Sequence, residues 1–211
     1  MSWNKYLTEF IGTFFLVLTI GCTVFSGAPG VIPPLAIGAV LMVMVYAGGH
    51  ISGAHYNPAI TVAVYLRGRC PASDIMPYVG AQLAGAGLAA VTALALLGKA
   101  RGPGGPLPAM GAALLAEFLF TFALAWVVLN VATSKATSGN SFYGLAIGMT
   151  VMTGAFAVGH ISGGVFNPAV AVGISLMGLS GWSNLWLYLL GTFGGAVVAA
   201  IVFKSINPGD R

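Results

Sequence analysis

The residues best suited to chemistry in this sequence lie in two similar ten-residue segments, 50–59 and 160–169. They read His-Ile-Ser-Gly-Ala-His-Tyr-Asn-Pro-Ala and His-Ile-Ser-Gly-Gly-Val-Phe-Asn-Pro-Ala, so seven of their ten positions are identical. Asn is a preferred helix N-cap, and Pro is preferred at the first helical position. Asn57 and Asn167 are therefore each predicted to start a helix, with the positive end of the helix dipole beside the amide.

Other reactive constellations are absent from the sequence. Only four residues are acidic, so no Ser/His/Asp set can be assembled, and no His, Cys, Asp or Glu cluster has the spacing of metal ligands. The two cysteines do not suggest a disulfide framework. We therefore expect no enzyme activity, no metal and no cofactor.

The composition is that of an integral membrane protein. Of the 211 residues, 58% are hydrophobic and only 6% are charged, against roughly 25% charged in soluble domains. A chain with this little charge cannot cover a water-exposed surface. The composition therefore excludes a soluble enzyme, a disordered tail and a protein that binds nucleic acid.

Six apolar stretches are long enough to cross a membrane, because about 20 helical residues span the hydrocarbon core. They lie at residues 6–26, 34–51, 75–97, 110–131, 141–161 and 183–204. Two further apolar pieces, 57–67 and 167–177, would form helices of roughly 16 Å, about half of the core. The predicted fold is all-α, with six transmembrane helices and two half-helices.

The two halves of the chain repeat one another. The segment at 50–59 recurs 110 positions later, and Glu9 with its following Phe recurs at Glu117, 108 positions later. We predict one repeat at 1–105 and a second at 106–211, each with three spans and a half-helix. Because three is odd, the second copy is inverted in the membrane, and the two half-helices meet near its midplane.

This arrangement predicts a lumen at the point where the half-helices meet. The segments 52–56 and 162–166 are expected to be extended backbone, which is tolerated at that depth only where it is buried in protein or lines a cavity. Their carbonyl groups would be acceptors, and the two Asn amides would be donors at the centre. Such a lumen suits a neutral solute, while the positive helix ends repel cations.

Three ionisable side chains lie inside the predicted membrane segments. Glu9 and Glu117 are expected to accept hydrogen bonds from the irregular loop of their own repeat, with proton coupling as the alternative. His55, two residues before Asn57, is expected either to line the pore or to pack beside it.

The basic residues predict the orientation of the chain, because they gather in cytoplasmic connections. With the N-terminus in the cytoplasm, only Lys99 and Arg101 lie outside. The other six lie inside: Lys5, Arg67, Arg69, Lys135, Lys204 and Arg211. We therefore expect both termini in the cytoplasm, and an inner or plasma membrane as the location.

With these features together, the sequence resembles the aquaporin family of major intrinsic proteins. The resemblance covers nearly the whole chain. It is carried by the two Asn-Pro-Ala boxes, by Glu9 and Glu117, by Gly-His-Ile-Ser-Gly-Ala-His at 49–55, and by Ala81-Gln82. It implies a right-handed bundle of six helices with two half-helices, assembled in lipid as a homotetramer with one pore in each subunit.

The resemblance also implies a selectivity filter at four positions, counted from the two boxes. They are Ile37, Ala155, Gly164 and Val170. Strict water channels of the family resemble an arrangement of Phe, His, a small residue and Arg. Here the aromatic residue, the His and the Arg are absent, which predicts a wide, apolar filter without a fixed positive charge.

We therefore predict a passive channel for water and small uncharged solutes. The candidate solutes are glycerol, urea, ammonia, hydrogen peroxide and undissociated metalloid acids such as arsenite. A strict water channel is one alternative. An ion-coupled secondary transporter is another, although it would need charged or polar groups at the midplane, where the sequence offers two Asn and backbone. A closed membrane protein, or a pore gated by dewetting, is the third.

Overall fold

The computed structural model describes residues 2–25, 27–28, 30–98, 107 and 109–210, and within these residues it is helical without strands. Six long helices are apolar enough to cross a membrane. They are α1 (Ser2–Ile20), α2 (Ile32–Ser52), α4 (Ala72–Leu97), α5 (Met110–Val128), α6 (Tyr143–Ser162) and α8 (Leu185–Ile206). Two short helices, α3 (Pro58–Leu66) and α7 (Pro168–Leu176), are the predicted half-helices. The sequence prediction of the fold is confirmed.

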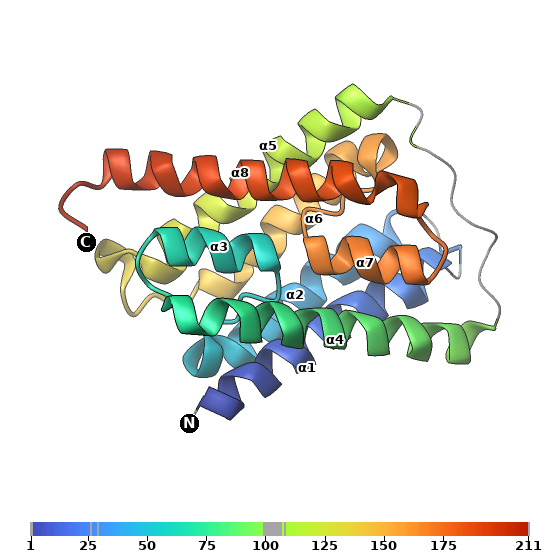
Figure 1. Ribbon diagram of the computed structural model, residues 1–211, viewed down its shortest axis with the longest axis horizontal. Helices are drawn as coiled ribbons and strands as arrows, with labels where there is room; N and C mark the ends of the chain where they lie inside the picture. Colours follow the sequence, from blue (N-terminus) through green and yellow to red (C-terminus); the bar gives the residue numbers. More distant parts are fainter. Residues whose placement is uncertain (1, 26, 29, 99–106, 108, 211) are drawn as a thin grey trace.

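The helices pack in matching pairs in the two halves of the chain. α1 contacts α4 and α2, just as α5 contacts α8 and α6. The half-helices α3 and α7 each pack against both α4 and α8. α3 and α7 meet at their N-terminal ends and run toward opposite ends of the molecule (Figure 1). This is the arrangement expected of an inverted repeat.

Two glycines allow close crossings between α1 and α4 and between α5 and α8. A Cβ atom at Gly85 of α4 would overlap the backbone carbonyl of Phe10 in α1, and one at Gly195 of α8 would overlap that of Phe118 in α5. The helix backbones are therefore in direct contact, as is typical of small residues at membrane helix interfaces. The two crossings are related by the internal repeat.

The C-terminal ends of α1 and α5 widen into short π-helices, which the sequence analysis did not predict. These are η1 (Gly21–Phe25) and η2 (Leu129–Thr133), again 108 residues apart. In η2 the carbonyl of Asn130 accepts from Thr137 Oγ1 at 2.5 Å, and that of Val131 accepts from Asn140 Nδ2 at 2.7 Å. These bonds hold the connection between α5 and α6, which includes the 3-10 helix η3 (Lys135–Thr137).

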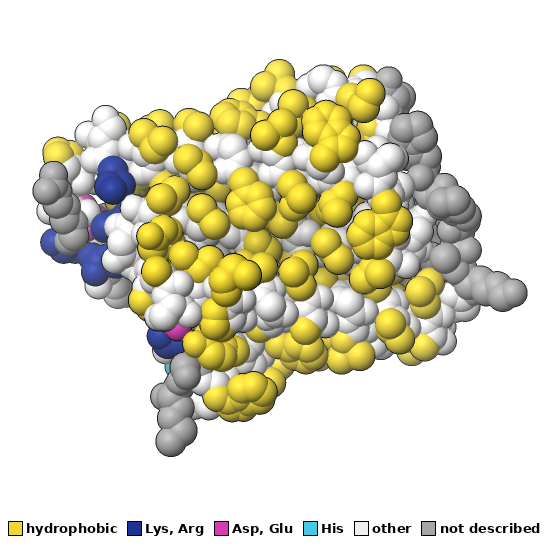
Figure 2. Space-filling model, in the orientation of Figure 1, with side chains coloured by type: hydrophobic (Ala, Val, Ile, Leu, Met, Phe, Trp, Pro, Cys, Tyr) yellow, Lys and Arg dark blue, Asp and Glu magenta, His cyan; other side chains and the backbone are white. Residues whose placement is uncertain are grey.

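The described basic side chains gather at the end of the molecule where both ends of the chain lie (Figures 1 and 2). They are Lys5, Arg67, Arg69, Lys135 and Lys204. We call this the basic end. Between the two ends, Figure 2 shows a face rich in hydrophobic side chains, as a lipid-facing surface requires. Lys99, Arg101, Arg211 and the predicted repeat boundary at 105/106 lie outside the described residues.

Candidate functional site

The centre of the molecule is formed by the two Asn residues at the start of the half-helices. Oδ1 of Asn57 accepts from the backbone N–H groups of Ala59 at 2.9 Å and Ile60 at 3.4 Å. Asn167 caps α7 with the same two distances. Both helices therefore begin where the cap residues predicted, and both place their positive ends at the centre.

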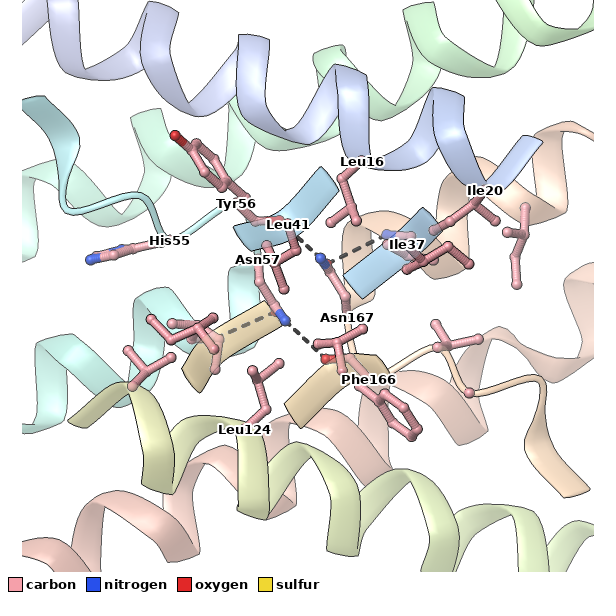
Figure 3. Close-up of a pocket in the computed structure, with 18 of the residues that line it drawn as sticks. Leu16, Ile20, Ile37, Leu41, His55, Tyr56, Asn57, Leu124, Phe166 and Asn167 are labelled. Carbon is pink, nitrogen blue, oxygen red and sulfur yellow. Dashed lines mark hydrogen bonds between the residues drawn. The ribbon is translucent and has the colours of Figure 1, made fainter. Parts of the chain in front are cut away.

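Each Asn side chain also reaches the loop of the other repeat (Figure 3). Nδ2 of Asn57 donates to the carbonyl of Phe166 at 2.9 Å, and Nδ2 of Asn167 donates to the carbonyl of Tyr56 at 2.8 Å. Because a side-chain amide carries two N–H donors, one N–H of each Asn remains for a solute. The two bonds accepted at each Oδ1 fix which amide atom is nitrogen.

The segments before the two Asn residues are not uniformly extended, so the sequence prediction is wrong in this respect. Ser52 and Ser162 still belong to α2 and α6. Three residues of each segment then have a positive φ: Gly53, Ala54 and Tyr56 in the first repeat, and Gly163, Gly164 and Phe166 in the second. Left-handed residues turn successive backbone N–H groups toward one anion. Such conformations cost of order 1 kcal/mol or more outside glycine, so the loop needs a partner that holds it.

The carboxylate of Glu9 is the partner of the first loop. One of its oxygens accepts from Ser52 Oγ at 2.6 Å and from the His55 N–H at 2.9 Å. The other accepts from the Tyr56 N–H at 2.6 Å and from Gln82 Nε2 at 2.8 Å. Glu9 is fully buried, and four donors satisfy its lone pairs. These are the loop contacts expected from the sequence.

Glu117 holds the second loop with three donors instead of four. It accepts from Ser162 Oγ at 2.6 Å, from the Val165 N–H at 2.9 Å and from the Phe166 N–H at 2.7 Å. Thr192 occupies the place that Gln82 has in the first repeat, and its hydroxyl donates to the carbonyl of Tyr188 on its own helix.

The ring of His55 both lines the central cavity and packs against protein. Its Nδ1 lies 3.1 Å from Thr61 Oγ1, which also accepts from Gln82 Nε2 at 3.1 Å and donates to the Asn57 carbonyl at 3.1 Å. One hydroxyl has a single proton, so all three contacts persist only when Nδ1 carries the imidazole proton. Nε2 is then the acceptor of this ring.

Two tyrosines that the sequence analysis did not single out complete the loop supports. The hydroxyl of Tyr78 donates to the Ser52 carbonyl at 2.6 Å, and that of Tyr188 donates to the Ser162 carbonyl at 2.9 Å. Each bond satisfies an acceptor at the end of a long helix. The signal for them was present, because the tyrosines share the 110-residue offset of the two boxes.

A central cavity of about 70 Å³ surrounds the two Asn amides. A cavity needs roughly 10–15 Å³ to hold one water, so this one has room for water. Of the four predicted filter residues, Ile37, Gly164 and Val170 line it. Ala155 does not: α6 passes so close to Gly164 that the Ala155 backbone lies beside the loop. Val151, one turn earlier on α6, lines the cavity instead.

The walls of this cavity are aliphatic and follow the internal repeat. No Asp, Glu, Lys or Arg is among the lining residues in the described part of the chain. Five repeat-related pairs of aliphatic side chains line it: Leu16 and Leu124, Ile20 and Val128, Ile37 and Ile147, Leu41 and Val151, and Ile60 and Val170. The polar groups among these residues are therefore His55, the two Asn amides, the loop backbone and Tyr56, whose hydroxyl donates to the Met44 carbonyl at 2.9 Å.

The central cavity continues toward the basic end through two further cavities. His55 and Val128 line both the central cavity and a connecting cavity of about 210 Å³. Gly53, Arg69 and Thr133 line both this connecting cavity and an open vestibule of about 810 Å³. The three cavities, which share these lining residues, follow one another from the midplane toward the basic end.

A sequence profile of the major intrinsic protein family matches residues 1–203, nearly the whole chain. The chain belongs to this family. Among curated proteins similar to this chain, the probable aquaporin NIP4-2 of Arabidopsis thaliana is 35% identical to it, over 99% of this chain and 76% of its own length. Aquaporin NIP1-1 of Oryza sativa subsp. japonica is 39% identical, over 97% of this chain and 74% of its own. The glycerol uptake facilitator protein-like 6 of Lactiplantibacillus plantarum is 37% identical, over 98% and 100%.

Among solved structures, the aquaglyceroporin from Plasmodium falciparum superposes on this major intrinsic protein with a TM-score of 0.83. It covers 99% of this chain and 98% of its own, at 19% sequence identity, and so shows the shared fold. The protein is thus a multi-pass integral membrane protein and a passive channel for water and small solutes. Members of this family are channels, not enzymes.

Proposed function

We propose that this channel conducts small uncharged solutes larger than water in addition to water itself. The proposed filter is formed by Ile37, Gly164 and Val170, with Ala155 beside Gly164. The candidate solutes are glycerol, urea, ammonia, hydrogen peroxide and undissociated metalloid acids such as arsenite. The observation that carries this proposal is Val170, a buried aliphatic residue in the first turn of α7 that lines the cavity.

Val170 supports a wide filter because of what its side chain lacks. A valine at this place presents two methyl groups to the lumen, and its counterpart in the first repeat, Ile60, is equally apolar. An arginine would extend a charged, hydrogen-bonding group across the same space. The apolar walls also favour solutes that have an apolar side, while the two Asn donors and the loop carbonyls serve their polar groups.

The relatives support this proposal through their names. One of them is called a glycerol uptake facilitator protein-like protein and is matched over its whole length. A strict water channel remains the alternative. Ion-coupled transport is disfavoured, because the carboxylates of Glu9 and Glu117 already hold their loops and are absent from the lining of the central cavity.

We further propose that the basic end faces the cytoplasm, with both termini on that side, in a cell inner or plasma membrane. The five described basic residues at this end support the proposal through the positive-inside rule. Assembly as a homotetramer in lipid is proposed from the family resemblance.

Stopped-flow light scattering on proteoliposomes tests the proposed function. Vesicles loaded with the channel are exposed in turn to gradients of sorbitol, glycerol and urea, with empty vesicles as the control. We expect rapid shrinkage followed by rapid reswelling with glycerol or urea, without any ion gradient. Rapid shrinkage with no reswelling above the control indicates a strict water channel. Solute flux that saturates and requires an ion gradient indicates a transporter.

A further inference from the structure

Among the described residues, fixed positive charge lines the pore only on the side of the basic end. The central cavity has no charged lining residue in the described part of the chain, whereas the vestibule is lined by Arg69 and Lys135. Arg69 also lines the connecting cavity, which His55 joins to the central cavity. Neither the connecting cavity nor the vestibule has an Asp or Glu among its described lining residues.

Arg69 is poorly neutralised by its surroundings. The nearest acid is Asp210, whose Oδ1 lies 3.9 Å from an Arg69 Nη atom, at the limit of an ion pair. Asp210 is bound more closely by the buried Arg67, at 2.7 Å. Two positive charges, those of Arg67 and Arg69, therefore share the one negative charge of Asp210, which also accepts from the backbone N–H of Lys135. The side chain of Arg69 is 41% exposed.

This charge has no counterpart in the second repeat. The residue 110 positions after Arg69 is Leu179, and the residue at the same offset from Arg67 is the buried Met177. The internal repeat thus provides similar scaffolds in the two halves of the pore, but among the described residues it places a weakly paired cation, Arg69, in the first half where the second half has Leu179. Figure 2 shows the basic side chains gathered there.

We propose that Arg69 is a specificity-determining residue that excludes cations at the vestibule, a task that the apolar filter around Val170 cannot perform. A fixed charge at the narrowing mouth of a low-dielectric pore repels cations and raises the local concentration of anions. The inference goes beyond the proposed solute range, and it holds for a strict water channel as well. The plainer reading is that Arg69 only orients the chain in the membrane.

The charge at the vestibule is tested first by a chemical reporter that does not depend on permeation. Ser138 is exposed and lines the vestibule. The reporter is Ser138→Cys, made in a variant whose native cysteines are removed by Cys22→Ala and Cys70→Ala. The thiol is reacted with an anionic and a cationic methanethiosulfonate reagent of similar size. The ratio of the two rates reports the local potential, because any change in thiol ionisation affects both reagents equally.

We expect Arg69→Gln to lower the anionic-to-cationic rate ratio about tenfold, as for a unit charge at close range in a partly aqueous site. Arg69→Lys should keep the ratio within about twofold of the parent. Lys204→Gln is the matched control, because it removes one charge at the basic end without lining the vestibule. Equal ratios in Arg69→Gln and Lys204→Gln overturn the proposal.

The consequence for permeation is tested with guanidinium and urea, which have nearly the same shape and differ by one charge. Proteoliposomes are held at zero potential with potassium and valinomycin. Arg69→Gln should raise the guanidinium-to-urea flux ratio about threefold. The effect is smaller than on the rate ratio because guanidinium and urea differ by one charge, whereas the two thiol reagents differ by two. An unchanged flux ratio, with urea flux intact, overturns the role of Arg69 in selectivity. Absence of urea flux contradicts the proposed solute range instead, and the rate ratio alone then decides on Arg69.

Discussion

The two repeats build the same scaffold around their buried carboxylates but surround it with different side chains. Glu9 and Glu117 each bind a serine hydroxyl and two consecutive loop N–H groups, at nearly equal distances. In the first repeat, Gln82 extends this network to Thr61 and from there to His55.

The corresponding residues of the second repeat, 110 positions later, are Thr192, Ala171 and Val165, which do not extend it. The duplicated backbone therefore sets where the loops lie. The side chains that differ between the repeats set the polarity of each half of the pore, and the polar half leads to the basic end.

The largest expected effect comes from neutralising the two carboxylates. In Glu9→Gln and Glu117→Gln, an amide N–H₂ group would face N–H donors of the loop, and charge-assisted bonds would be lost. We expect Glu9→Gln to lower the free energy of unfolding by about 3 kcal/mol and Glu117→Gln by about 2 kcal/mol, because Glu9 holds four donors and Glu117 three. Denaturation in mixed detergent micelles measures both. A larger loss in Glu117→Gln would contradict the comparison.

The two Asn caps should be nearly equivalent. Asn57→Ala and Asn167→Ala each remove two accepted bonds and one bond to the opposite loop, with matching distances. We expect each substitution to cost about 2 kcal/mol of unfolding free energy. The same micelle assay should find the two values within about 0.5 kcal/mol of each other. A clear inequality would show that the repeats differ at their shared centre.

The network around Gln82 predicts a smaller effect that is confined to the first repeat. Gln82→Leu removes the donor to Glu9 and Thr61, but it also removes a buried acceptor, Oε1, that has no partner in the described structure. We expect a net loss of about 1 kcal/mol. Thr192→Val, the matched change, should cost about 0.5 kcal/mol or less, since the Thr192 hydroxyl bonds only its own helix. Equal losses would argue against an extended network.

The smallest effect concerns the ends of the half-helices. α3 is followed by Arg67, which binds Asp210, whereas α7 is followed by the buried Met177. Hydrogen bonds from the Ser134 side chain and the Lys135 N–H, together with Arg67, hold the pKa of Asp210 below its usual 3.8.

The folded pKa is thus lower than the unfolded one. The stabilisation by Asp210 is complete above pH 3.8 and is lost as the pH falls through the folded pKa. The protection factors of residues 134–140, which correct the exchange rates for their intrinsic pH dependence, should therefore fall in acid in the wild type. In Asp210→Asn they should already be low at neutral pH and stay flat in acid. A wild-type profile that is also flat would show that Asp210 does not hold this segment.

Features set by local chemistry and by the repeat could be predicted from the sequence. The Asn caps, the half-helices and the contacts of Glu9 and Glu117 follow from residue preferences and from the common offset. The left-handed residues Ala54 and Tyr56 could not be predicted, because neither is a type that favours a positive φ. Their conformation is held by Glu9, directly through the Tyr56 N–H and through the Ser52 hydroxyl for the Ala54 N–H.

The remaining differences depend on packing between helices. Ala155 lies outside the lining because α6 approaches Gly164, which no count of residues along the chain reveals. The position of Arg69 on the pore likewise required the folded connection between α3 and α4, since the sequence shows it only as one of several basic residues near a span end.

The central claim is that the apolar residue at 170 lets solutes larger than water through, and Val170→Arg tests it most directly. The measurement is the ratio of glycerol or urea permeability to water permeability in proteoliposomes, for the wild type and the variant. A narrower, charged filter should lower this ratio about tenfold or more, with water flux reduced far less. Equal reduction of water and solute fluxes, or an unchanged ratio, would contradict the account.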